Sequence, residues 1–452
     1  MNDAPSPPRV SSVRRRSILY EAHNLTLSGG TGIATYARTL AQSAGRLGYE
    51  VDGLFGVERG LTRGDHRLNE VLAFDSIDED KWLSPLETAW RNVRYPFNAL
   101  GGLRPIELPR SGLVMGPIAE ALQPFRRVFA ATHLIDIAMA HFKVYGRLAQ
   151  LRLPDRPDVF HATHPVPLAL KGCPNIYTIH DLVPLRLPYT TQDNKKYFYR
   201  LLTTLARTAD HIVTVSEYSR RDIVEHLGID ERRVTNTYQA VDVPPELLAR
   251  RDDEVAADLA KHFGLVFGKY FLFYGAIEPK KNVSRLIDAF AASGSKLPLI
   301  VAGGGGWQNR ADLRKIRDER FTHFRIDGDI VRRQRQVRRL DYLPRDQLLT
   351  LIRGARALLF PSIYEGFGLP VIEAMALGTP VVTSNGSSLT EVAGDAALLV
   401  DPYSIDSIAW AIRSMDADAD LRRELAERGR QQATKFSPLA YDERLRQLYE
   451  KF

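Results

Sequence analysis

Cysteine is almost absent from this chain of 452 residues, since Cys173 is its single cysteine. One thiol cannot form a disulfide within the chain, and without a cysteine cluster there is no thiolate zinc site, so we predict a reducing compartment. The sequence also has no apolar run of about 18 residues and no apolar segment typical of a signal peptide. We therefore predict a cytoplasmic protein that neither spans a membrane nor carries a secretion signal.

What the chain does have is enough hydrophobic sequence for more than one core. It is 44% hydrophobic and 25% charged, which is ordinary for a soluble globular protein. Its length predicts two or three domains. Residues 1–16 are rich in Pro, Ser and Arg and are interpreted as a disordered basic tail. The net charge of +7 indicates an anionic partner.

Two basic segments are candidates for contact with such a partner. The segment "VRRQRQVRR" at 331–339 is interpreted as a solvated or salt-bridged helix face, and because no nucleic-acid-binding motif accompanies it we predict no nucleic-acid partner. The segment "HFKVYGRLAQLRLPDRP" from His141 mixes apolar and basic residues. It either lies on an anionic membrane surface, together with the arginines at 14–16, or packs into the core with a basic rim. The first hypothesis implies peripheral association with the inner face of the cell membrane.

The order of apolar runs predicts an α/β protein made of two doubly wound, Rossmann-like domains that face each other across a cleft. Each half contains a strand, a loop, a helix and a further strand, which is the unit of a parallel sheet. The predicted domains cover 17–245 and 246–434, joined by a proline- and charge-rich linker. Residues 435–452 are predicted to form a helix that crosses back to the first domain. No elements could be assigned within 60–145.

The segment "YEGFGLPVIEAMALG" at 364–378 carries the main candidate site. It follows an apolar strand, and its glycines at 366 and 368 allow a tight turn next to a ligand. Pro370 suits the first turn of a helix, so amides near Gly368, Leu369 and Val371 are predicted to point at one anion, which fits a phosphate. Ligands of doubly wound sheets bind at such strand ends.

Two glutamates flank this predicted phosphate site. A carboxylate can accept hydrogen bonds from two neighbouring hydroxyls, so Glu365 and Glu373 could hold hydroxyls on opposite sides of a diphosphate. A nucleotide sugar has this arrangement of hexose, diphosphate and ribose. The alternative is that Glu365 is surface charge and Glu373 only favours the first helical turn.

Other loops at strand ends offer further donor contacts. Lys280 and Lys281, in "GAIEPKKN", are candidate phosphate ligands, with a solvated lysine pair as the alternative. In "SGGTG", Gly29, Gly30 and Gly32 are predicted to line the same cleft from the first domain.

Five motifs in chain order resemble family 4 glycosyltransferases, which are retaining enzymes with the GT-B fold. The resemblance runs from about residue 17 to 452 and rests on "SGGTGIATYARTL", "VTVSEYSRRDI", "GAIEPKKN", "EGFGLPVIE" and "SNGSSLTEVAGDAALLVDP". It implies a hexosyltransferase whose donor contacts include the loop residues Gly366, Phe367, Gly368 and Leu369.

The resemblance also implies roles for single residues. Glu365 would contact hydroxyls of the transferred sugar, Glu373 would bind the ribose, and Lys281 would contact the diphosphate. His180, at the end of the predicted strand "NIYTIH", would contact the donor hexose and support transfer. Asp181 would either orient that imidazole or approach the acceptor hydroxyl. The chain departs from its relatives at Lys280 and Ala276, where arginines are frequent, and in "QAVD" near the linker.

The implied reaction needs no cofactor and no metal. The leaving diphosphate oxygen would help to deprotonate the acceptor on the same face of the sugar. The segment "TIHDLVPLRLP" resembles bacterial mannosyltransferases of surface polysaccharide and lipopolysaccharide assembly, so GDP-mannose is the first choice of donor, with UDP-glucose or UDP-N-acetylglucosamine as the alternative. The acceptor would be a glycan or a lipid-linked oligosaccharide.

Competing functions have weaker support in the sequence. A nicotinamide-dependent oxidoreductase would need a third glycine where "GGTGIAT" has Thr35. A metal-dependent transferase could use Asp327 and Asp329 in "DGD", but these lie in a highly charged segment and are interpreted as loop carboxylates. A non-catalytic sensor of nucleotide sugars or an RNA-binding protein are the non-enzymatic alternatives.

Overall fold

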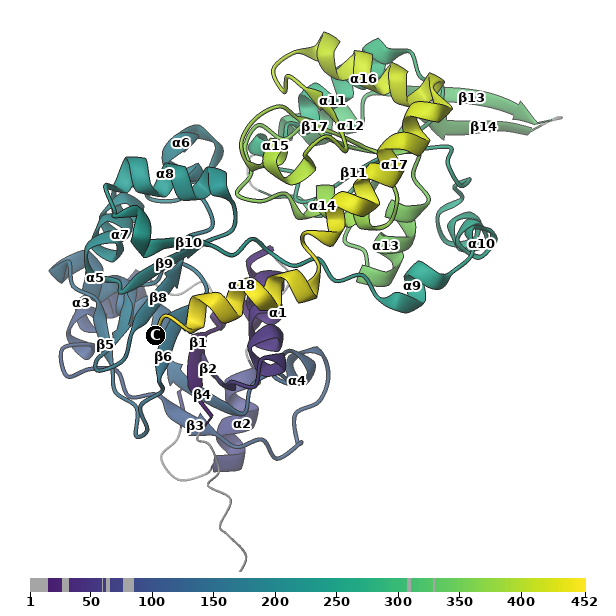
Figure 1. The fold of residues 1–452 in the computed structure, drawn as a ribbon. Helices are drawn as coiled ribbons and strands as arrows, with labels where there is room; N and C mark the ends of the chain where they lie inside the picture. Colours follow the sequence, from purple (N-terminus) through teal and green to yellow (C-terminus); the bar gives the residue numbers. More distant parts are fainter. Residues whose placement is uncertain are drawn as a thin grey trace, which may run out of the picture.

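A computed structural model describes residues 15–26, 32–58, 60–61, 66–75, 85–306, 310–327 and 330–452. Gly29, Gly30, Asp329 and nearly all of the predicted basic tail lie outside these residues. In the described part, most strands belong to one of two sheets, which are well separated in space (Figure 1).

The first sheet has eight strands in the order β10-β9-β8-β6-β1-β2-β4-β3. All its neighbours pair in parallel except β3 and β4, which are antiparallel at one edge. Its strands are β1 (Ser17–Glu21), β2 (Glu50–Val57), β3 (Ile106–Leu108), β4 (Arg127–Thr132), β6 (Val159–Ala162), β8 (Asn175–Thr178), β9 (His211–Thr214) and β10 (Val234–Asn236). We call this sheet with its helices the N-terminal unit.

The second sheet has six parallel strands in the order β15-β12-β11-β16-β17-β18. These are β11 (Phe271–Tyr274), β12 (Leu299–Ala302), β15 (Val337–Leu340), β16 (Ala357–Phe360), β17 (Val381–Ser384) and β18 (Leu398–Val400). This sheet with its helices is the C-terminal unit. The predicted α/β fold with two doubly wound sheets is confirmed.

Helices follow the strands in both units, as parallel connections require. In the N-terminal unit they are α1 (Gly32–Arg46), α2 (His66–Phe74), α3 (Pro85–Asn98), α4 (Pro117–Ala121), α5 (Leu134–Tyr145), α6 (Val183–Arg186), α7 (Lys195–Thr208) and α8 (Glu217–Leu227). Next along the chain come α9 (Pro245–Ala249), α10 (Asp252–Phe263), α11 (Val283–Ser293), α12 (Arg310–Ile316), α13 (Arg345–Arg353), α14 (Leu369–Ala376), α15 (Ser388–Ala393), α16 (Ile405–Ala417), α17 (Ala419–Thr434) and α18 (Pro438–Tyr449). None of the helices in the described part of the chain combines the length and apolar character that crossing a bilayer requires.

Apolar spacing explains why these segments take their observed forms. The β1 residues are all buried, as expected for a central strand covered on both faces. In α1 the buried residues recur every three or four positions, so one side of the helix faces the sheet.

The last helix, α18, lies against the N-terminal unit beside α1 and β1 (Figure 1). The hydroxyl of Tyr449 lies 2.6 Å from that of Tyr20 and 2.7 Å from Nδ1 of His161. Nε of Arg46 donates to Oδ2 of Asp442 over 2.9 Å. The buried tyrosine and histidine contacts, with the partly exposed Arg46–Asp442 pair, fasten the end of the chain to the N-terminal unit.

One sequence interpretation needs correction. Residues 331–339 are not a helix face, because they form β14 (Ile330–Arg335) and β15. β14 pairs with β13 (Thr322–Asp327) in a hairpin that projects from the C-terminal unit (Figure 1), with Asp327 at its end. For the basic segment that starts at His141, the alternative of core packing with a basic rim fits the structure better. Helix α5 ends at Tyr145, the short strand β5 (Ala149–Leu151) pairs with β7 (Leu168–Leu170), and Phe142 and Leu151 are buried.

Candidate active site

The end of β8 places His180 and Asp181 at the carboxyl edge of the first sheet. Nε2 of His180 lies 3.0 Å from the carbonyl oxygen of Thr163, so this nitrogen carries the proton and donates it. The ring also meets Tyr36 edge to face at 4.8 Å between centroids. Burial lowers the pKa of His180 to about 4, so the imidazole is neutral near pH 7. Asp181 accepts a hydrogen bond from the amide of Val183 over 2.9 Å.

The "PKKN" loop places two lysines beside two buried glutamates. Nζ of Lys281 lies 2.7 Å from Oε1 of Glu365, and Nζ of Lys280 lies 3.5 Å from Oε1 of Glu278. Both glutamates are almost fully buried. The loop is tied to the segment after β16, because the carbonyl of Lys280 accepts hydrogen bonds from Ser362 Oγ and the Ile363 amide.

Charge coupling in this cluster is visible in the pKa values of its members. Burial would raise the pKa of Glu365, but Lys281 and Lys280 outweigh that effect and lower it. Burial would lower the pKa of Lys280, but Glu365, Asp181 and Glu278 hold it well above its ordinary range. The Glu365 carboxylate and the Lys280 ammonium are therefore both ionised at neutral pH.

The turn after Glu365 brings the two units together. A Cβ at Gly366 would lie 2.9 Å from both Asp181 Oδ2 and the His180 carbonyl oxygen, so a side chain there is excluded. Gly368 has a φ of 109°, which favours glycine, and it precedes the first residue of α14. The structure thus joins the predicted site residues of the N-terminal unit to those of the C-terminal unit.

Some predicted donor contacts are occupied by the protein itself. The amide of Val371 donates to the carbonyl of Gly368 over 3.0 Å, so it does not point at an anion as the sequence suggested. The side chain of Phe367 is buried against Phe436 and Tyr238, which leaves its backbone as the part that can face a ligand. Leu369 begins α14 as expected.

Glu373 is buried on α14 and held by two side chains that sequence reasoning did not identify. Its Oε1 accepts from Nη1 of Arg345 over 2.8 Å, and its Oε2 accepts from the hydroxyl of Tyr274 over 2.6 Å. Arg345 also donates to the carbonyl of Asp242 in the linker. Each carboxylate oxygen can accept a further hydrogen bond, so these contacts orient Glu373 without closing it to a ligand.

Two more predicted motifs meet across the units. The carboxylate of Glu391, from the "SNGSSLTEVAGD" motif, accepts hydrogen bonds from the amides of Glu217 and Tyr218 over 2.8 and 3.0 Å. These amides open α8, in the "VTVSEYSRRDI" motif, so Glu391 satisfies donors at a helix N-terminus. The hydroxyl of Tyr364 also donates to Asp222 on α8.

A row of polar side chains continues along the strand ends of the first sheet. Glu21, the last residue of β1, is fully buried; it accepts from the His23 amide over 2.9 Å and its carboxylate lies 3.0 Å from Nδ1 of His164. Burial would raise the pKa of Glu21, but His164 and His23 lower it. The sequence reasoning missed these residues, although each lies at the end of a strand or two residues beyond it.

Within the described residues, Glu58, His133 and Asp136 place ligand atoms within 4.8 Å of one another at the ends of β2 and β4. This grouping was also not foreseen, because Glu58 is far in sequence from His133 and Asp136, which lie at the start of α5. Gly32, the described member of the "SGGTG" loop, is the exposed first residue of α1.

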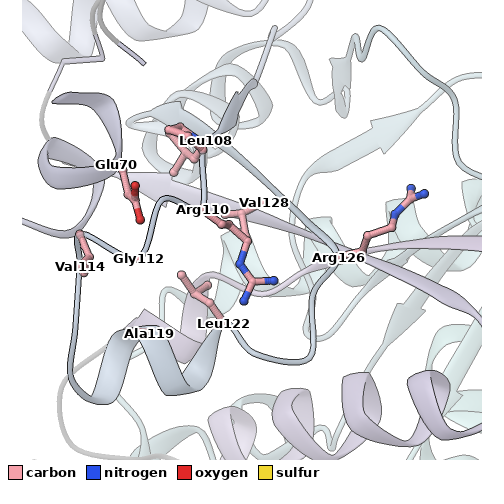
Figure 2. A pocket seen from close by; sticks show the side chains of 10 residues that line it. Glu70, Leu108, Arg110, Gly112, Val114, Ala119, Leu122, Arg126 and Val128 are labelled. Carbon is pink, nitrogen blue, oxygen red and sulfur yellow. The ribbon is translucent and has the colours of Figure 1, made fainter. Parts of the chain in front are cut away.

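A cavity of about 430 Å³ lies elsewhere, beside edge strand β3 (Figure 2). Its charged groups are already paired: Glu70 accepts from the amide and hydroxyl of Ser111, Arg126 pairs with Asp52, and Arg110 donates to the Phe125 carbonyl. None of its lining residues belongs to the predicted site. The junction of the two units remains the better candidate for chemistry.

Comparison with known proteins agrees with this geometry. The family model described as Glycosyl transferases group 1 matches residues 264–432, and that described as Glycosyltransferase Family 4 matches residues 117–243. Together they span more than half of the chain. The O-antigen chain mannosyltransferase B of Escherichia coli is 34% identical over 58% of this chain and 66% of its own length. The serotype-specific mannosyltransferase WbdA of Escherichia coli is 27% identical over 57% of this chain.

The chain covers 66% of the length of the first of these relatives and 31% of the length of WbdA. Among solved structures, Anabaena Alr3699/HepE in complex with UDP and glucose aligns over 97% of this chain and 100% of its own, with a TM-score of 0.65 and 13% identity. That likeness shows the fold. Two family models in chain order, two facing parallel sheets and the mannosyltransferase relatives lead to one conclusion: the chain belongs to the family 4 glycosyltransferases, enzymes with the GT-B fold.

Proposed function

We propose that the protein transfers a hexose from a nucleotide sugar to a hydroxyl of a glycan or lipid-linked acceptor during surface polysaccharide assembly. Mannose from GDP-mannose is the first choice, because relatives of this chain are named as O-antigen mannosyltransferases. A UDP-sugar is the alternative, because the structural neighbour is described with UDP and glucose, although it shares only 13% of its sequence.

The close approach of Gly366 to the His180–Asp181 pair is the observation that supports this proposal most, because residues that we assign to the donor site lie near each other there although they come from different units. We assign residues 246–434 to the donor side and 17–245 to the acceptor side. The diphosphate would lie at the start of α14, near the amides of Gly368 and Leu369 and the ammonium groups of Lys280 and Lys281. Glu373 would hold the ribose.

His180 is suited to bind the donor sugar as a hydrogen-bond acceptor. Its Nε2–H group donates a hydrogen bond to the Thr163 carbonyl, so Nδ1 keeps a lone pair that can accept a hydrogen bond from a sugar hydroxyl. The depressed pKa keeps this lone pair unprotonated at neutral pH. Asp181 would approach the acceptor hydroxyl, since the ring of His180 is held by Thr163 instead.

The proposed chemistry retains the configuration of the sugar. The bond from the anomeric carbon to the diphosphate oxygen breaks, a bond to the acceptor oxygen forms on the same face, and the acceptor proton passes to the leaving phosphate oxygen. The two lysines would stabilise the charge that develops on the leaving group. A double displacement would instead need a carboxylate nucleophile, whereas Glu365 is held by Lys281 and Ser362.

A nucleotide-sugar screen tests the proposal. Thermal unfolding with each donor identifies the one that binds, since a ligand at about 100 times its dissociation constant adds about 2.7 kcal/mol of stability. Consumption of that donor with an acceptor glycan, and the anomeric configuration of the product by NMR, then test transfer and retention. Binding without consumption would favour a sensor, and a product of inverted configuration would refute the proposed chemistry.

A further inference from the structure

Helix α3 leaves an apolar side in solvent. Trp90, Val93, Phe97 and Leu100 are 63%, 68%, 58% and 61% exposed. Their spacing of three or four residues places them on one side of the helix and its first following turn. The opposite side already packs on the protein, since Pro96 and Ala99 are buried. The core therefore does not require the exposed side, and an exposed apolar patch of this kind marks a contact site.

The end of α5 continues this patch. The ring of Phe97 lies 6.4 Å from that of Tyr145, and Val144 beside it is 58% exposed. Nδ1 of His141 lies 2.9 Å from the carbonyl of Pro96, which fixes the two helices to each other. We call the six exposed side chains the α3–α5 surface; they are Trp90, Val93, Phe97, Leu100, Val144 and Tyr145.

The charges around this surface are mostly positive. Residues 90–104 and 137–152 contain no Asp or Glu, and their charged members are Arg91, Arg94, Arg104, Lys143, Arg147 and Arg152. The guanidinium of Arg94 lies 4.9 Å from the centroid of the Trp90 ring, so a cation lies directly beside an exposed aromatic ring of the surface. The carboxylates Glu58 and Asp136 lie beside His133 at the other end of α5, near Arg91 of α3. Glu87 belongs to α3 as well and precedes Trp90 by three residues.

We propose that the α3–α5 surface docks onto the surface of an anionic phospholipid bilayer. Aromatic side chains such as Trp and Tyr favour the headgroup level, and Lys and Arg at the same depth pair with lipid phosphates. An anionic bilayer offers an extended negative surface, which a predominantly basic apolar patch complements. Figure 1 shows α3 and α5 on the side of the N-terminal unit away from the C-terminal unit, so docking leaves the junction of the units accessible.

This surface differs from the one that the sequence suggested. Of the segment 141–152, Phe142 and Leu151 are buried and belong to the core, so only its exposed residues can take part. Most of the exposed apolar side chains of the α3–α5 surface come from α3 and the turn after it. This helix lies in the part of the chain where the sequence analysis assigned no elements. The docking proposal does not depend on sugar transfer.

Vesicle flotation tests it with the whole protein. We expect the protein to float with vesicles of equal amounts of phosphatidylglycerol and phosphatidylcholine, and to bind phosphatidylcholine vesicles at least about tenfold more weakly, because several cations each contribute roughly a fivefold factor. The double variant W90E/F97E should lose roughly tenfold or more in binding to the anionic vesicles. Both positions are exposed, so the fold should persist, which circular dichroism and the thermal midpoint would verify.

Trp410→Glu is the matched control, because Trp410 is also an exposed helical tryptophan, at 51%, but lies on α16 of the C-terminal unit. It should bind vesicles as the unchanged protein does. Failure of the unchanged protein to bind anionic vesicles at low and physiological salt would overturn the proposal. Vesicle binding by W90E/F97E equal to that of the unchanged protein would also overturn it. If the unchanged protein bound no vesicles but formed a dimer that W90E/F97E did not form, the surface would instead contact a second copy of the chain.

Discussion

Replacing Glu365 with glutamine separates its proposed role from that of Glu373. In the structure, Glu365 is buried, ionised and paired with Lys281, whose own side chain is only 13% exposed. Glutamine keeps the shape and removes the charge. The ammonium of Lys281 then loses its anionic partner but keeps its place above the ring of Phe360, 5.1 Å away.

The expected change in unfolding free energy follows from the pairing of Glu365 with Lys281. Removing one partner of a buried ion pair costs about 3–5 kcal/mol, and the residual exposure of Lys281 places Glu365→Gln near about 3 kcal/mol of unfolding free energy. A nucleoside diphosphate would supply the missing negative charge. Its affinity should therefore stay unchanged or rise by up to about tenfold, equivalent to about 1.4 kcal/mol. Turnover should fall by more than tenfold, because the sugar contact is lost as the transition state forms.

Glu373→Gln should behave in the opposite way. Its contacts with Arg345 and Tyr274 hold a carboxylate that we assign to the ribose. Losing a hydrogen bond from a charged group costs roughly 1.5–3 kcal/mol, so the diphosphate and the nucleotide sugar should both bind about ten- to a hundredfold more weakly. Glu427→Gln changes the net charge equally on an exposed part of α17 and serves as the control.

Calorimetric titration with GDP and UDP, beside turnover assays, measures both effects. The unfolding free energy of each variant, with and without the diphosphate, checks whether the ligand restores Glu365→Gln more than the parent. Equal losses of diphosphate affinity in the two site variants would refute the division of roles. Normal binding and turnover in both would show that these glutamates are ordinary charges.

Three further predictions concern pH, metals and the contact between the units. Burial lowers the pKa of His161 to about 3, whereas in the unfolded chain this histidine binds a proton below about pH 6.5. The contribution of the neutral His161 to the unfolding free energy should therefore be complete above about pH 6.5 and fall by about 1.4 kcal/mol per pH unit below it. Urea unfolding at several pH values should show a shallower decline for His161→Gln, and an identical decline would contradict this. Transfer should continue in EDTA, and a loss of activity that manganese restores would reject metal independence and direct attention to the group around His133. Glu391→Ala should cost about 1–2 kcal/mol and speed hydrogen exchange at the Glu217 and Tyr218 amides, which native-state exchange would measure; unchanged exchange would disprove the capping role.

The sequence predicts the sheets of this fold well because their signals are local. Apolar runs such as 271–274 and 357–360 are buried on both faces, and glycine or proline residues mark their ends. Such runs need no knowledge of the rest of the chain. The α3–α5 region is different, because α3 has apolar residues on two sides and includes Pro96, so its pattern indicates no single buried face.

The candidate site was predictable in part for the same reason. Positions at strand ends, such as His180 and Lys281, follow from the strands themselves. Their partners do not, because Arg345 and Tyr274 reach Glu373 from distant parts of the sequence. The helix interpretation of 331–339 was wrong because arginines are compatible with both a helix and a strand, and the choice depends on pairing with β13 and β12.

The pairing of Lys281 with Glu365 also constrains how a donor can gain binding energy. If Lys281 contacts the diphosphate as we propose, it cannot hold the Glu365 carboxylate and a phosphate at full strength at once, so donor binding would exchange one charge pair for part of another. The net electrostatic gain in the ground state is then a small difference between two similar terms. As the bond to the diphosphate breaks, negative charge on the leaving oxygen grows while that on Glu365 does not. In the proposed reaction the ammonium of Lys281 would therefore attract the phosphate most strongly in the transition state. Such a differential attraction raises turnover rather than only tightening binding.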